Sequence, residues 1–213
     1  RLMMTSSVYR QTSRPASERG VATDPNNQLL WRMRLRRLDS EAIRDSLLAV
    51  SGALDGRMGG PPVLLDARPD GMVVIADKET AGRHKRSVYL LARRAYNLSL
   101  LTVFDQPLIA TTCARRDTSA VPLQSLALLN DRFVAEQAER LAGRVTLDSG
   151  ATGEAAVRLA FRLALARAPN PAELKMCTKG LAKQAETYRA AKLAAADADR
   201  KALTQLCHTL LNT

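Results

Sequence analysis

Three pairs of arginines stand in stretches of this sequence that contain few apolar residues. The pairs are Arg10 with Arg14, Arg93 with Arg94, and Arg115 with Arg116. A guanidinium group presents a planar fork of N–H donors that matches carboxylate or sulfate oxygens two at a time. The six arginines are therefore candidate contacts for an anion.

The same arginines also have a purely structural interpretation. Loops with little apolar content need polar ties, and arginine supplies them to carbonyl oxygens and carboxylates. Asp39, Glu41 and Asp45 are the acidic residues that we expect as partners. The residues favour this structural interpretation. Burial of the arginines together with such pairing would rule out anion binding by them.

No complete catalytic constellation is present. His84 and His208 are the two histidines of the sequence, His84 lying in a basic loop, and no G-x-S-x-G or glycine-rich phosphate-binding motif occurs. We therefore predict no catalytic residues and no metal ligands in this chain. Whether the chain forms part of an enzyme stays open.

The cysteines do not suggest a cofactor either. There are three, Cys113, Cys177 and Cys207, and no C-x-x-C pair. Thr204 stands where the first cysteine of a haem-attachment motif ending in Cys207-His208 would be. We expect Cys207 to be buried in a helix, and we predict no cofactor bound by this chain.

Composition limits the class of protein further. The chain has 213 residues, of which 46% are hydrophobic and 4% aromatic, and a net charge of +11. Such a chain can build a core from aliphatic residues. Despite the basic charge we expect no nucleic-acid partner, because stacking platforms need aromatic side chains. No apolar run approaches the roughly 20 residues of a membrane span.

The element pattern is mainly helical. A helix is predicted over residues 39–54, with Ile43, Leu47, Val50 and Leu54 on its buried face. A long β-hairpin is predicted to pair residues 72–76 with 87–91, and a short helix covers residues 98–104. Residues 29–38 fit either a strand or the approach to a helix.

The C-terminal half reads as a helical bundle. A helix opens at Pro122, and its buried stripe holds Leu126, Leu129, Phe133, Gln137 and Leu141. Asn130-Asp131 could interrupt this helix. Residues 143–153 read as a linker. Three helices follow, over residues 153–167, from the Asn170 cap to about residue 191, and from Asp197 or Asp199 onward. The last of them is expected to point Leu203, Leu206, Cys207 and Leu210 inward.

We therefore expect one mainly α domain over residues 1–213. Residues 1–120 would form a loop-rich part with one long helix and a small hairpin, and residues 121–213 the bundle. Both ends of the sequence look internal to a longer protein, because neither carries the features of a natural terminus.

An ordered series of motifs carries a family resemblance. These are LMMTSSVYRQ at 2–11, DPNNQLLWR at 24–32, RRLDSEAIRD at 36–45, GGPPV at 59–63, RSVYL at 86–90, FDQP at 104–107, VPLQSLALLND at 121–131 and LCHTLLN at 206–212. Together they resemble the planctomycete C-terminal domain of unknown function catalogued as fifteen fifty-three. Where the family usually has a proline after the Asn-Asp pair, this sequence has Arg132. Without that proline, the Pro122 helix would continue unbroken.

The resemblance implies a context rather than a set of catalytic residues. It implies an accessory or interaction domain at the C-terminal end of a multidomain protein that is exported to the periplasm or cell surface. Its partners would be upstream domains of the same polypeptide, including a cytochrome c-like domain with haem c. The alternative implied is part of a polysaccharide-processing enzyme, with the six arginines binding a sulfated or uronic glycan.

Overall fold

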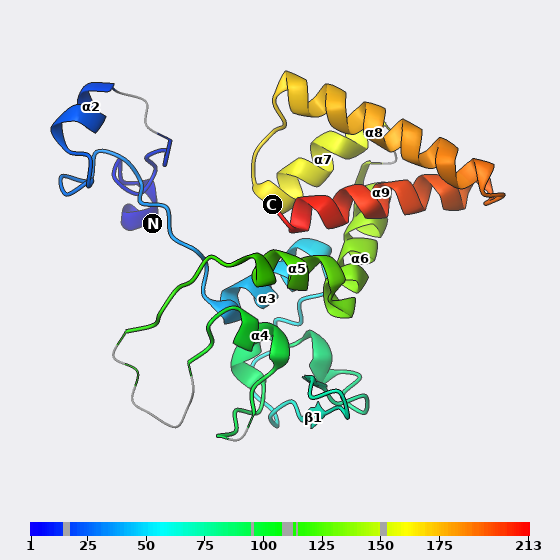
Figure 1. Ribbon diagram of the computed structural model, residues 1–213, viewed down its shortest axis with the longest axis horizontal. Helices are drawn as coiled ribbons and strands as arrows, with labels where there is room; N and C mark the ends of the chain where they lie inside the picture. Colours follow the sequence, from blue (N-terminus) through cyan, green and yellow to red (C-terminus); the bar gives the residue numbers. More distant parts are fainter. Residues whose placement is uncertain (15–17, 95, 108–112, 114, 150–152) are drawn as a thin grey trace. The chain divides into compact units, whose positions relative to one another are not determined.

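The computed structural model describes residues 1–14, 18–94, 96–107, 113, 115–149 and 153–213 (Figure 1). Two compact units are present, Arg1–Leu38 and Asp39–Thr213. The first contains the short helices α1 (Leu2–Thr5) and α2 (Glu18–Thr23). The second contains the remaining elements, namely α3 (Ser40–Ser51), β1 (Leu65–Ala67), β2 (Val73–Ile75), the 3-10 turns η1 (Gly82–His84) and η2 (Ser87–Tyr89), α4 (Ser99–Val103), α5 (Pro122–Asn130), α6 (Arg132–Ser149), α7 (Glu154–Leu165), α8 (Pro171–Ala190) and α9 (Ala195–Leu211). The mainly α fold predicted from the sequence is confirmed.

The first unit is organised around the carboxylate of Asp24. That carboxylate accepts hydrogen bonds from the backbone N–H of Leu29 at 2.7 Å and of Gln28 at 2.9 Å. The Trp31 indole donates to the Asp24 carbonyl oxygen at 2.9 Å. Because the N–H groups of Leu29 and Gln28 stabilise the ionised carboxyl, the pKa of Asp24 lies below its usual value. A polar turn therefore holds this unit together, and residues 33–38 form neither strand nor helix.

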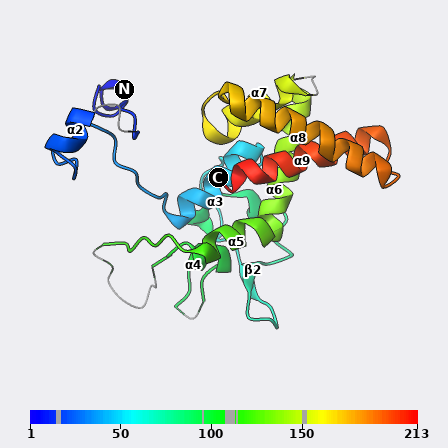
Figure 2. The same ribbon diagram turned by 45° about the horizontal axis from the view of Figure 1, so that its top comes forward.

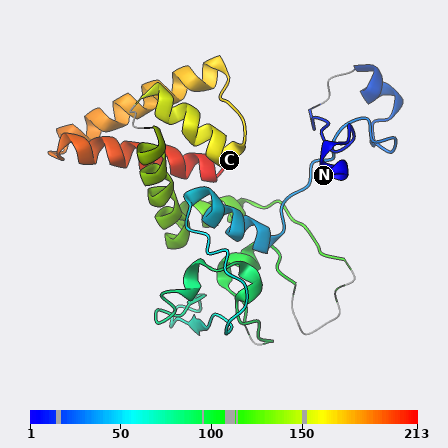
Figure 3. The same ribbon diagram turned by 180° about the vertical axis from the view of Figure 1, so that it is seen from behind.

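The bundle of the second unit packs α6, α7, α8 and α9 around an aliphatic core (Figure 3). Leu141, Val145 and Val157 are fully buried there, and Phe161 nearly so. Cys207 is also fully buried, as predicted, and burial raises the pKa of its thiol to about 12. Among the described helices, none combines the length and hydrophobicity needed to cross a bilayer.

A capping box begins α8, as the sequence predicts. The Asn170 side chain accepts from the backbone N–H of Glu173 at 2.8 Å, and the Glu173 carboxylate accepts from the backbone N–H of Asn170 at 2.8 Å. Both donors would otherwise lack an acceptor at the helix terminus.

The hairpin is present, but its predicted pairing is wrong. Strand β2 pairs antiparallel with β1, Leu65 opposite Ile75, and Gly71 turns between the strands with φ of +85° (Figure 2). The segment predicted as its partner forms η2 instead. There the N–H groups of Tyr89 and Leu90 close local turns onto Arg86 and Ser87, so they cannot join a ladder. Within residues 87–91, the bridge that remains is the parallel one between Val63 and Leu90.

The buried face of α3 also differs from the prediction. Leu47 is buried as expected, whereas Ile43, Val50 and Leu54 are half-buried. The fully buried positions include Leu48 and Arg44, so the face is rotated toward Arg44. Apolar periodicity alone could not indicate this, because it treats an arginine as a solvent-facing residue.

Arg44 connects α3 to both 3-10 turns. Its Nη2 donates to the Arg83 carbonyl oxygen at 2.8 Å, and its Nη1 donates to the Lys85 carbonyl at 3.0 Å and to Ser87 Oγ at 3.2 Å. The guanidinium carbon lies 5.4 Å from the centre of the Phe133 ring on α6. The segment 83–87 has no regular ladder to satisfy its carbonyls, and Arg44 supplies the missing donors.

The Pro122 helix is interrupted at Asp131, which confirms the alternative based on Asn130-Asp131, and the alternative of an unbroken helix is wrong. Asp131 adopts an extended conformation between α5 and α6, and its carboxylate accepts from the Phe133 N–H at 2.7 Å. This interruption leaves Leu126 and Leu129 exposed, contrary to the predicted stripe, while Gln137 and Leu141 are buried. Helix α6 continues to Ser149, so most of the predicted linker is helical.

Replacing Asn170 with Ala should lower the free energy of unfolding by about 1 kcal/mol, because the Glu173 N–H loses its acceptor. Lys179→Ala, at an exposed position of the same helix, is the control and should leave stability nearly unchanged. Urea unfolding of the three proteins measures the difference. Equal midpoints for both variants would show that the cap does not stabilise α8.

Arg44→Met should lower the free energy of unfolding by about 3 kcal/mol or more, because acceptors in segment 83–87 lose their donors. The matched control is Arg86→Met. Arg86 pairs with Asp45 at 3.5 Å but is 63% exposed, so its loss should change stability by about 0–1 kcal/mol. Denaturant unfolding with equal losses for both variants would contradict the role assigned to Arg44.

Candidate functional site

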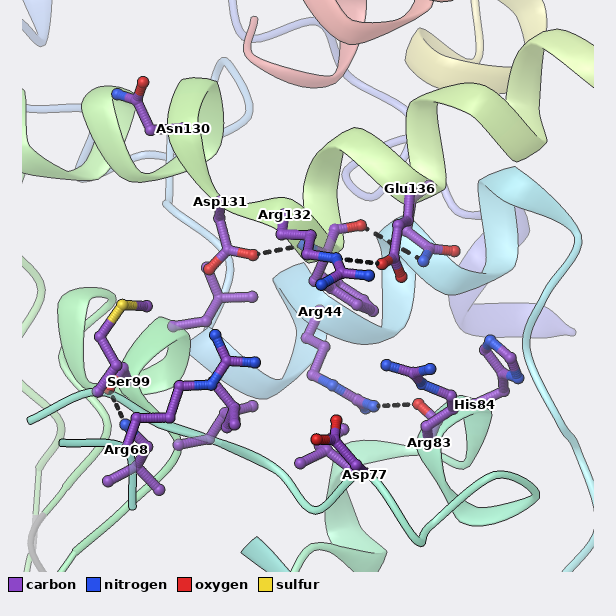
Figure 4. Close-up of a pocket in the computed structure, with 18 residues that line it drawn as sticks. Arg44, Arg68, Asp77, Arg83, His84, Ser99, Asn130, Asp131, Arg132 and Glu136 are labelled. Atoms are coloured by element: carbon purple, nitrogen blue, oxygen red, sulfur yellow. Dashed lines mark hydrogen bonds and ion pairs between the residues drawn. The ribbon is translucent and has the colours of Figure 1, made fainter. Parts of the chain in front are cut away.

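A hollow of about 300 Å³ lies beside Arg44, within the second unit (Figure 4). Its walls come from β2 and the turn before it, from η1, from the start of α4, and from the junction of α5 with α6. Apolar side chains including Val73, Leu98 and Phe133 form part of the lining. The volume is at the lower end of the range for small-molecule sites.

Arg44 forms the innermost cation of this hollow. It is fully buried, and burial lowers its pKa to about 10, with Asp45 opposing that shift, so the group stays charged at neutral pH. Its three hydrogen bonds use three of the five guanidinium N–H groups. Two N–H groups thus form no hydrogen bond with described residues and are available to another acceptor.

The acidic neighbour of Arg44 is shared among several donors. Asp45 Oδ1 lies 3.6 Å from Arg44 Nη1, but it also accepts from the N–H and the hydroxyl of Ser87, each at 2.7 Å. Arg86 is a further partner of the same carboxylate. A buried charge is unfavourable unless it is paired, and here the pairing is incomplete.

Two more guanidinium groups line the hollow from exposed loops. Arg68 belongs to the hairpin turn and Arg83 to η1, and Figure 4 shows them on either side of Arg44. Neither side chain forms an ion pair or a hydrogen bond with any part of the chain that the structure describes. Their N–H donors are therefore free to bind an anion.

The other charged groups of the hollow are largely occupied. Arg132 donates to Glu136 at 3.0 Å, and Asp131 accepts from the Phe133 N–H. Asp77 is the third carboxylate that lines the hollow. The lining thus holds four arginines, with Arg44, Arg68 and Arg83 beside Arg132, against three carboxylates, a net charge of +1.

His84 contributes no charge at neutral pH. It is half-buried, and burial followed by the nearby cations Arg140, Arg83 and Arg44 lowers its pKa, against a smaller opposing effect of Glu136. Within the described residues, no three His, Cys, Asp or Glu side chains are grouped to hold a metal ion. The arrangement is suited to binding an anion.

The six arginines singled out from the sequence do not come together at this hollow. Arg10 and Arg14 lie in the first unit, exposed and without an ion pair to described residues. The other four belong to the second unit. There, Arg94 and Arg115 are likewise exposed and without an ion pair to described residues.

The remaining two predicted arginines are engaged. Arg93 stacks on the Tyr96 ring at 5.6 Å and donates to its hydroxyl at 2.9 Å. Arg116 binds both oxygens of Glu41, at 2.6 and 3.0 Å, and lies 3.9 Å from Asp39. For Arg116 the structural interpretation therefore holds.

Two further hollows lie in the second unit. One of about 480 Å³ is lined by Arg116 and Arg86, but Glu41, Asp39 and Asp45 already pair with these arginines. The other, about 770 Å³, is a mainly apolar hollow within the bundle between α6, α8 and α9. The described arginines that line these two hollows are exposed, whereas Arg44 is fully buried.

Sequence reasoning missed Arg44, Arg68 and Arg83 because they are far apart in the chain and none belongs to an arginine pair. One local signal was available. Arg44 follows Ile43 within the apolar pattern of residues 39–54, next to Leu47 and Leu48 on the helix surface. An arginine at such a position is either extended to solvent or buried with several acceptors.

Comparison with known proteins supports the family resemblance over residues 1–181. No curated protein and no solved structure matches the chain. Residues 1–181 match the PSD1 family, described as a protein of unknown function (DUF1553). Since the match covers most of the 213 residues, the chain belongs to this family of unknown function.

Proposed function

We propose that this chain is an accessory domain that docks onto other domains of the same polypeptide, and that residues 1–38 form the docking surface. One observation carries the proposal. Among the described residues of this unit, every large apolar side chain except Trp31 is exposed, and the buried residues are Asp24 and Asn27. The exposed residues are Leu2, Met3, Met4, Val8, Tyr9, Val21, Leu29, Leu30, Met33, Leu35 and Leu38.

So dense an apolar surface is typical of an interface. Leu2 is 90% exposed and Leu35 is 84% exposed, although each would gain about 1.5–3 kcal/mol from burial. Large exposed apolar patches mark contact sites in soluble proteins. The polar turn at Asp24 gives the segment a defined shape without burying these residues.

Charge indicates the chemistry of the partner. Residues 1–38 contain eight arginines and two acidic residues, so they carry +6 of the chain's net +11. A partner surface with apolar pockets and an acidic rim would complement this segment. A protein surface fits better than a lipid one, because α1 and α2 have four and six residues and lipid-bound segments are usually long amphipathic helices.

The proposed context follows from the ordered motifs that resemble the planctomycete domain. In that context the parent protein is exported, and the partner domains lie upstream and include a cytochrome c-like domain with haem. The proposed role in this chain is to bind those domains rather than to catalyse a reaction on its own.

Leu29→Asp combined with Leu35→Asp should weaken binding to the upstream domains by about 100-fold or more, because charges replace two exposed leucines that the proposed interface would bury. Leu147→Asp with Met176→Asp is the matched control, since both residues are exposed apolar positions in the bundle. Titration calorimetry with the purified upstream domains measures the affinity. Wild-type affinity in the first variant would refute the docking surface.

The melting temperature distinguishes a role of these leucines in docking from a role in packing within the chain. The two double variants should melt at the same temperature as the wild-type chain, because the exposed side chains contribute little to its folding. A lower melting temperature for the Leu29 and Leu35 variant alone would mean that these leucines pack within the chain itself.

The second candidate function is binding of a sulfated or uronic glycan as part of a polysaccharide-processing enzyme. The exposed guanidinium groups of Arg94 and Arg115, which have no ion pair with described residues, favour it. Arg10 and Arg14, in the first unit, are exposed as well and have no ion pair with described residues. The engaged state of Arg93 and Arg116 limits the number of arginines that contribute.

Arg94→Gln combined with Arg115→Gln should weaken binding to a sulfated oligosaccharide by about tenfold, since each lost cation removes charge-assisted hydrogen bonds. Arg158→Gln with Arg200→Gln removes the same charge from exposed helical ion pairs and serves as the control. Binding measured by fluorescence anisotropy should also fall with salt. Equal affinities for both variants would exclude these loops as a glycan site.

A further inference from the structure

We infer that the hollow beside Arg44 is a binding site for a small monocarboxylate with an apolar body. The starting point is the Arg44 guanidinium, which is fully buried, lines the hollow and keeps two N–H groups without a partner among the described residues. A buried cation with donors to spare is stabilised by an anion that reaches it.

The surrounding groups determine how such an anion would be held. Arg68 and Arg83 lie at the same hollow with unpaired side chains, so an entering carboxylate meets three guanidinium groups (Figure 4). The other carboxylates are placed differently. Glu136 is bound to Arg132, and Asp131 holds the start of α6, which leaves Asp77 as the opposing charge.

Charge and shape together define the ligand class. The lining has a net charge of +1, with His84 neutral, so a single negative charge would balance it. Val73, Ile75, Leu98 and Phe133 provide an apolar wall that suits a hydrocarbon or aromatic body. The volume of about 300 Å³ limits the ligand to the size of a simple aromatic or short aliphatic acid.

The site is independent of the docking surface proposed for residues 1–38, since all of its residues lie in the second unit. Its occupancy can be measured on the chain without any partner domain. Failure of one proposal therefore leaves the other intact.

Benzoate is the probe for this proposal, titrated into the 213-residue chain at constant ionic strength and followed by calorimetry and by melting temperature. We expect saturable binding and a rise in melting temperature, because the ligand binds the folded state. Arg68→Gln and Arg83→Gln should each weaken benzoate binding by about tenfold. Both residues are exposed, so these variants should remain folded.

Matched controls decide between this site and simpler explanations. Arg162→Gln, an exposed arginine on α7 outside the hollow, should bind benzoate as the wild type does. Benzyl alcohol, which has a similar body without the charge, should bind at least tenfold more weakly than benzoate. Equal binding of the alcohol, equal loss in Arg162→Gln, or no saturable benzoate binding would each overturn the proposal. Binding of sulfate without binding of benzoate would also overturn it.

Discussion

The buried guanidinium of Arg44 is the constraint on which the loop-rich part of the second unit depends. Residues 83–87 extend from η1 into η2 without forming a regular ladder, and their carbonyl oxygens need donors. Arg44 provides those donors from α3, while the Phe133 ring of α6 covers its face. One side chain thereby fixes a helix, two turns and the start of the bundle with respect to one another.

Arg44 donates to these carbonyl oxygens, but the positive charge of its guanidinium is only partly balanced by carboxylates of the protein. Asp45 divides its oxygens between Ser87, Arg86 and Arg44, so part of the positive potential stays at the hollow. Arg68 and Arg83 add to that potential, and Arg44 helps to set the position of the turn that carries Arg83. Structural and ligand-binding roles of arginine are thus joined in one residue here, whereas the sequence presented them as alternatives.

The two units are stabilised in different ways, and this difference relates to the proposed docking. The second unit has aliphatic cores, one of them containing Leu141, Val157 and Cys207. The first has a polar turn at Asp24 and leaves its leucines and methionines exposed. A segment without an apolar core contributes little to folding by itself. Its apolar residues are then available for an interface.

The sequence by itself determined most of the helices of the second unit, the capping box at Asn170, the burial of Cys207 and the family resemblance. These features depend on neighbours within a few positions, where periodicity and capping chemistry act. Tertiary structure alone decided the partner of β2, the face of α3 and the gathering of Arg44, Arg68 and Arg83. Those outcomes depend on contacts between residues far apart in the chain, such as those of Arg44 with the carbonyl oxygens of Arg83 and Lys85. The spacing of residues in the sequence does not show which distant groups come into contact in the folded chain.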